Sequence, residues 1–70
     1  MAVIFNVEHE REEDGRWLAE VVELPGVLAC SYDKDEAIAR AKALAESVVA
    51  DRLERGEVGP DYRDISFKDV

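Results

Sequence analysis

The chain has 70 residues, of which 47% are hydrophobic and 37% charged, and its formal net charge is −8. This length allows one domain with one small core, and the acidic balance excludes the basic surface by which proteins hold nucleic acid. No run reaches the length of a membrane span, and Met1 to His9 lack the pattern of a signal peptide. We therefore expect one cytosolic domain over residues 1–70, with no membrane contact and no direct nucleic-acid contact.

The first third of the chain predicts a β-hairpin. Residues 2–8 and 16–23 are rich in β-forming residues, and the charged run between them ends in Asp14-Gly15. Asp-Gly between two such runs is typical of a two-residue hairpin turn, because both residues tolerate positive φ. That turn places His9 opposite Glu20 and puts Glu8 and Glu20 on opposite faces of the sheet.

A second turn follows at Leu24-Pro25-Gly26, where Pro25 fixes φ and Gly26 supplies conformational freedom. The β-rich residues 27–31 then predict a short third strand. The break between strands is too short for a crossover connection, so the three strands are expected to form an antiparallel meander.

Residues 34–55 predict one amphipathic helix. Asp33 is the expected N-cap, and Glu36 three residues later completes a capping-box pattern. Gly56 is the expected residue just past the helix. Residues 65–70 predict a final strand parallel to a neighbour, since it is reached through a helix. The predicted fold class is α+β: a two-layer β-β-β-α-β domain with the helix on one face of the sheet.

The order of these motifs resembles the HicB-like antitoxin domain family. The resemblance covers roughly residues 2–55, and its motifs are the turn Asp14-Gly15, the strand 17–21, the turn Leu24-Pro25-Gly26 and the helix start from Asp33 to Glu36-Ala37. Val22, Val27 and Ser31 stand where the family often has Pro, Cys and Gly.

The resemblance implies a partial RNase H-like fold and an antitoxin that neutralises a small basic RNA-cleaving HicA-type toxin by protein contact. Many family members add a DNA-binding segment after this domain. Only about 15 residues follow the predicted helix, so no such segment is expected.

The residues give no sign of catalysis, a metal or a cofactor. An RNase H-like nuclease needs several converging carboxylates, whereas the centre of the first strand is Phe5-Asn6-Val7. His9 has no Ser or Cys nucleophile at a recognisable spacing, and it is the only histidine. Cys30 is the only cysteine and has no adjoining basic residue, so a small packed side chain is its expected role.

The two faces of the predicted hairpin differ in character. The helix is expected to cover the more apolar one: Val3, Phe5, Val7, Leu18, Val22 and Leu24. The other face then carries the expected interface residues Ile4, Trp17, Ala19 and Val21, because exposed apolar patches with a large aromatic residue commonly mark interfaces.

Two kinds of partner follow from these surfaces. A short chain without a disulfide is expected to form a homodimer or a dimer of dimers. The acidic residues Glu10, Glu12 and Glu13 are a candidate contact for a basic partner, and a solvated hairpin tip is the plainer interpretation. Alternatives to an antitoxin are an orphan oligomeric adaptor domain and, more remotely, a degenerate RNase H-like nuclease.

Overall fold

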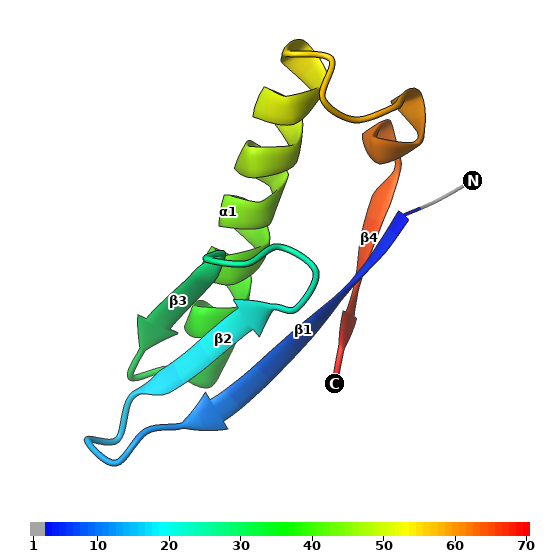
Figure 1. Cartoon of the computed structure of the whole chain (residues 1–70). Helices are drawn as coiled ribbons and strands as arrows, with labels where there is room; N and C mark the ends of the chain where they lie inside the picture. The colour runs from blue at the N-terminus through cyan, green and yellow to red at the C-terminus, as the bar shows by residue number, and fades with distance from the viewer. Residues whose placement is uncertain (1–2) are drawn as a thin grey trace.

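Four strands and one long helix form this α+β domain (Figure 1), for which a computed structural model describes residues 3–70. The elements are β1 (Val3–Arg11), β2 (Trp17–Val21), β3 (Leu28–Ser31), α1 (Lys34–Glu54), the 3-10 helix η1 (Pro60–Arg63) and β4 (Ile65–Asp69). The sheet order is β3-β2-β1-β4, and only β1 and β4 are parallel. The predicted fold class, meander and parallel final strand are confirmed; the expected strand start at Ala2 lies outside the described residues.

No helix in residues 3–70 is both long and apolar enough to cross a lipid bilayer. The 3-10 helix η1 connects α1 to β4 (Figure 1).

The first hairpin closes one residue differently from the prediction. The Glu12 amide donates to the Arg16 carbonyl at 2.7 Å, and the Gly15 amide donates to the Glu12 carbonyl at 3.0 Å. Gly15 has φ +91°, and no non-glycine residue of the described chain has a positive φ, so Asp14 does not adopt the geometry of a two-residue type I′ turn. The loop therefore has three residues and ends in a glycine bulge, a common alternative hairpin.

This extra loop residue shifts the register of β1 against β2 by one. His9 pairs with Ala19 rather than with Glu20, and Glu8 lies directly opposite Glu20. A shift of one residue exchanges the two faces of a strand. The predicted assignment of faces was therefore right for β1 and wrong for β2.

The Leu24-Pro25-Gly26 turn forms as predicted. The Val27 amide donates to the Leu24 carbonyl at 3.0 Å, and Gly26 has φ +87°, the positive value that a type II turn requires at its third position. The turn also buries Leu24 and Val27 in the core.

Helix α1 has well-defined ends. The Asp33 side chain accepts a hydrogen bond from the Asp35 amide at 3.1 Å and so caps the first turn. The expected reciprocal bond from Glu36 does not form: Glu36 pairs with Arg40, and the Asp33 amide donates to Ser31 Oγ. This local ion pair one turn along the helix removes Glu36 from the capping box.

At the other end of α1, the Glu57 amide donates to the Arg52 carbonyl at 2.8 Å and the Gly56 amide to the Leu53 carbonyl at 3.1 Å. This pair of bonds is a Schellman motif, with Gly56 at φ +70°.

Gly56→Ala is expected to lower the free energy of unfolding by about 1 kcal/mol, because Ala at positive φ is strained. Gly59→Ala is the matched control: neither glycine has a neighbour within 4 Å of an added Cβ, but Gly59 has φ −77°. Chemical denaturation should show a loss for Gly56→Ala alone. Equal losses of stability in the two variants would show that the positive φ of Gly56 is not the cause.

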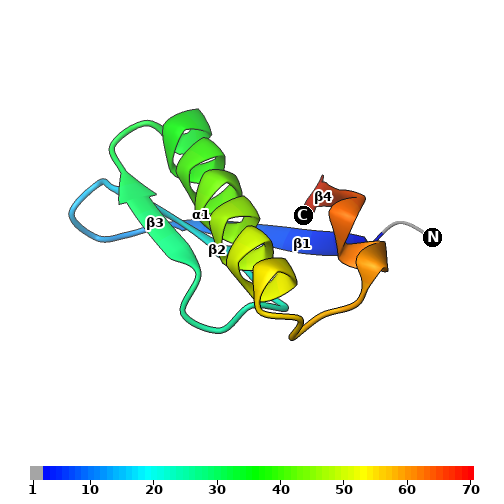
Figure 2. The ribbon, with the colours of Figure 1, turned by 90° about the horizontal axis from the view of Figure 1, so that it is seen from above.

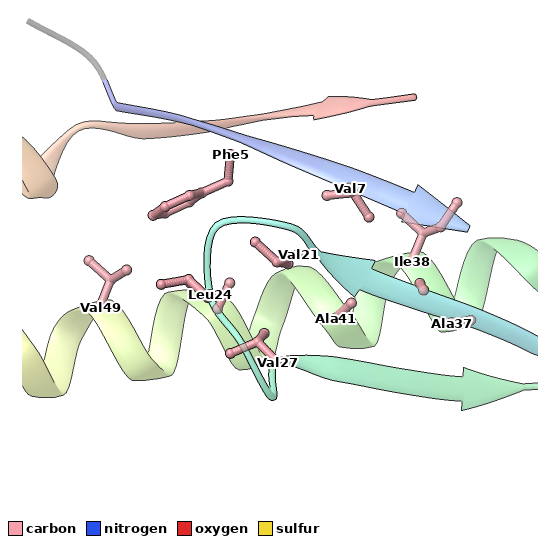
Figure 3. Packing of buried hydrophobic residues seen from close by; sticks show 11 residues of the cluster. Phe5, Val7, Val21, Leu24, Val27, Ala37, Ile38, Ala41 and Val49 are labelled. Atoms are coloured by element: carbon pink, nitrogen blue, oxygen red, sulfur yellow. The ribbon is translucent and has the colours of Figure 1, made fainter. Parts of the chain in front are cut away.

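The core lies between α1 and one face of the sheet (Figures 2 and 3). Ala37, Ala41 and Ala45 are fully buried and form a row along α1, so the helix backbone approaches the sheet closely. Among larger side chains of residues 3–70, only Val7 and Val21 are fully buried. The core is thus thin, and a domain of this size buries only roughly 60% of its unfolded surface.

Candidate functional site: the open face of the sheet

One face of the sheet has no helix over it; this face is turned towards the viewer in Figure 1, where α1 lies behind β2 and β3. Pairing and alternation place every second residue of each strand on this open face. Its residues are Ile4, Asn6, Glu8, Glu10, Leu18, Glu20, Leu28, Cys30, Ser66 and Lys68. The open face is thus the face of the sheet that α1 does not cover.

The four expected interface residues do not share a face. Ile4 lies on the open face and is 58% exposed. Ala19 and Val21 are fully buried under α1, so their assignment to an interface was wrong. Trp17 is half-buried on the helix side, where it packs against the core. The one-residue change of register explains all three errors.

The set expected under the helix is also divided. Phe5, Val7 and Leu24 are buried as expected, and Val3 is half-buried. Val22, by contrast, is 46% exposed, and Leu18 lies on the open face.

The open face carries both apolar and acidic side chains. Ile4 and Leu28 are large exposed apolar residues, and the half-buried Leu18 lies on β2 between their strands. Glu8 and Glu20 are directly paired across β1 and β2, an arrangement that is destabilising for like charges. A basic group placed over this pair would remove the repulsion.

Glu10 lies next to this pair on the same face of β1. Within residues 3–70, Glu8, Glu10 and Glu20 form no salt bridge. A shallow hollow of about 390 Å³ adjoins these carboxylates; its lining is Glu8, His9, Glu10, Leu18, Glu20 and Val70.

The expected acidic contact Glu10, Glu12 and Glu13 is likewise divided. Only Glu10 lies on the open face, whereas Glu12 and Glu13 belong to the hairpin loop. In the same loop the Asp14 carboxylate accepts hydrogen bonds from the amide and from the guanidinium of Arg16. Both bonds lower the pKa of Asp14, and the bond from the amide has the larger effect.

His9 lies on the helix side of β1. Its ring is tilted against that of Trp17 at 6.0 Å between centroids, and its buried Nδ1 has no hydrogen-bond partner among the described residues. Arg11 and Lys34 lie over the same indole ring, at 5.8 and 5.6 Å from its centroid. These four residues close the hairpin end of the core, and His9 also contributes to the lining of the hollow beside the open face.

Cys30 is half-buried on the open face, with a free thiol, and is paired with Leu18. In the part of the chain that the structure describes, no three His, Cys, Asp or Glu side chains come together as a group that could hold a metal ion.

Glu23 joins the second turn to β1. Its carboxylate accepts hydrogen bonds from the Asn6 amide at 2.8 Å and from Asn6 Nδ2 at 2.6 Å. The Val22 amide donates to the Asn6 carbonyl at 2.9 Å. Beyond the end of β2, the side chain of Glu23 thus takes the place of a neighbouring strand.

The hydrogen bonds from Asn6 lower the pKa of Glu23 below its usual value near 4.5, and the bond from the backbone amide has a larger effect than the bond from the side chain. A group whose pKa is lower in the folded state stabilises the protein at any pH above its pKa in the unfolded state. This contribution is lost as the pH falls through the pKa of the folded state. We expect wild-type stability to fall more steeply below pH 4.5 than that of Glu23→Gln, by up to about 1 kcal/mol for so exposed a group.

Denaturation curves between pH 7 and pH 3 measure this difference. Glu13→Gln is the control, because Glu13 forms no hydrogen bond or salt bridge among residues 3–70. Its curve should run parallel to the wild type; a Glu23→Gln curve that does the same would show that the Asn6 contact contributes nothing.

Sequence reasoning missed Leu18, Leu28, Glu8 and Glu20 as residues of one surface. The alternation of the strands carries that signal once the hairpin register is known. Comparison with protein-family models, with curated proteins and with solved structures found no match to this chain.

Proposed function

We propose that this chain is a non-catalytic antitoxin domain that neutralises a small basic RNA-cleaving protein of the HicA type by direct contact. The observation that carries the proposal is the open face, on which exposed Ile4 and Leu28 accompany Glu8 and Glu20, two carboxylates that form no salt bridge within residues 3–70. The nature of the partner rests on the resemblance of the turns and helix start to HicB-like domains. Such a complex would form in the cytoplasm, where the partner's RNA substrate is.

Charge supports a basic partner. A protein that cleaves RNA must carry a positive surface that holds phosphate, and a chain of net charge −8 is attracted to that surface and can exclude RNA from it. Complementary charge mainly raises the association rate and excludes wrong partners. Affinity then comes from buried apolar anchors, for which Ile4, Leu18 and Leu28 are the residues available on the open face.

Co-expression with a small basic RNA-cleaving protein of the HicA type tests the proposal. That protein alone should arrest growth, and this chain should restore growth and co-purify with it. Failure of both rescue and co-purification with a partner that does arrest growth would exclude the antitoxin function and leave an orphan interaction domain.

A further inference from the structure

The two edges of the sheet are built differently. The outer strand β4 carries Lys68 and Asp69, and Asp69 pairs with Lys42 of α1 at 3.0 Å. Charged side chains on an edge strand prevent pairing with other chains. The opposite edge, β3, reads Leu-Ala-Cys-Ser and lies within 24–32, the longest run without a charged residue in the chain.

Hydrogen bonding shows which backbone groups of β3 are free. The Val21 amide donates to the Val27 carbonyl at 3.0 Å, and Ala19 pairs with Ala29 in the same register. Because antiparallel strands alternate, the backbone groups of odd-numbered β3 residues point towards β2. Those of Leu28 and Cys30 therefore point away from the sheet, and Figure 1 shows no element beyond them.

Two apolar side chains flank this free edge. Leu28 is 43% exposed, and Tyr32, which directly follows β3, is 73% exposed. The edge thus combines free backbone donors and acceptors with apolar side chains and no charge. This combination favours the addition of another strand.

We propose that the chain forms a homodimer in which β3 pairs antiparallel with β3 of a second copy, about a two-fold axis at Cys30. In this register both sets of free backbone groups face each other. The opposing residues are Val27 with Asp33, Leu28 with Tyr32, Ala29 with Ser31 and Cys30 with Cys30. Each Leu28 meets a Tyr32 ring, and no two like charges lie opposite one another.

Charge identifies a second copy as the occupant. Two chains of net charge −8 repel each other over most of their surfaces, and 24–32 is where they can approach without opposed carboxylates. A basic partner would gain nothing from an uncharged edge, whereas the open face offers it Glu8 and Glu20. The β3 strand is also complementary to itself, because Leu28 of each copy lies opposite Tyr32 of the other. An unrelated strand would match this pattern only by chance.

This inference does not depend on the proposed function. A two-fold axis perpendicular to the sheet makes one continuous eight-stranded sheet from the two copies, with both open faces on the same side. The dimer leaves those faces free. It also moves the expected self-association from a sheet face to a sheet edge.

Cross-linking of the wild-type protein tests the register directly, because Cys30 is its only cysteine. Opposed residues of a hydrogen-bonded antiparallel pair have Cα atoms about 5.5 Å apart, within the range of about 4.4–6.8 Å that a disulfide spans. Oxidation with copper–phenanthroline should give a covalent dimer on a non-reducing gel. Sedimentation of the reduced protein at micromolar concentration should give the mass of a dimer.

Three variants serve as controls. Cys30→Ser/Ile4→Cys should not cross-link, because two β1 strands would lie five strand spacings, or about 24 Å, apart. Cys30→Ser should remain dimeric, whereas Cys30→Pro should be monomeric, because proline has no amide to donate to the second copy. The Cys30 amide points away from β2, so the substitution removes no hydrogen bond within the domain. Circular dichroism checks that Cys30→Ser and Cys30→Pro both fold.

A monomeric wild type, or a dimer that does not link through Cys30, would overturn the proposal, as would cross-linking of the Cys30→Ser/Ile4→Cys variant. The wild-type result decides the question even if Cys30→Pro does not fold. Loss of toxin binding by a dimer that does link through Cys30 would count against the proposed function alone.

Discussion

Val21→Asp is expected to unfold the domain. Val21 is fully buried between the sheet and α1, and a carboxylate there would have no partner in the core. Burying an unpaired charge costs several kcal/mol, and a core of this size rarely supplies more than about 3–5 kcal/mol of stability. Far-UV circular dichroism and a thermal melt should show loss of the cooperative transition.

Leu18→Asp is the matched control, three residues earlier on the same strand. Leu18 lies on the open face, so the new carboxylate remains hydrated and the domain should fold, with a lower melting temperature because the new charge lies directly opposite Glu10 and close to Glu20. The pair of variants tests the hairpin register. A folded Val21→Asp together with an unfolded Leu18→Asp would show that the hairpin has the two-residue turn predicted from the sequence.

Reversing charge on the open face is expected to slow binding of a basic partner at least tenfold, because steering by complementary charge raises association rates by about 10–1,000-fold. The variant is Glu8→Lys/Glu20→Lys, whose two sites are directly paired. Stopped-flow mixing at several salt concentrations should show a lower association rate and a weaker dependence on salt. Rescue of growth in the co-expression assay should fail.

Glu12→Lys/Glu13→Lys changes the net charge by the same amount but at the hairpin loop, and so controls for the overall charge. We expect its association rate to stay much closer to that of the wild type. A larger effect at the loop than on the face would place the partner at the hairpin tip, which is the contact that Glu12 and Glu13 suggest from the sequence.

Much of the fold could be predicted because its signals are local. Asp33, Gly56 and the apolar spacing between them define α1 to within one residue at its end. Leu24-Pro25-Gly26 predicts its turn because Pro at the second position and Gly at the third favour a type II turn. Each of these features depends on residues a few positions apart.

The composition of the open face could not be predicted in the same way. It depends on whether the loop before Arg16 has two residues or three, and Asp14-Gly15 is compatible with both. The choice depends on bonds around the whole loop, including those from Arg16 to Asp14. The pairing of Glu8 with Glu20 opposes the three-residue loop, but the burial of Val21 and Ala19 favours it, and burial of apolar surface stabilises the fold more than this repulsion destabilises it.

The parallel pairing of β1 with β4 also has a consequence for folding during synthesis. Val3 is paired with Ile65, so the first strand made completes its hydrogen bonds only with the last. At the usual rate of about 5–20 residues per second, roughly 3–12 s separate the two. During that interval β1 has an unpaired edge on one side, and the nascent domain can hold only the hairpin, the meander and the helix. The order of synthesis therefore means that the β1–β4 ladder cannot close until the residues of the meander and of α1 have been made.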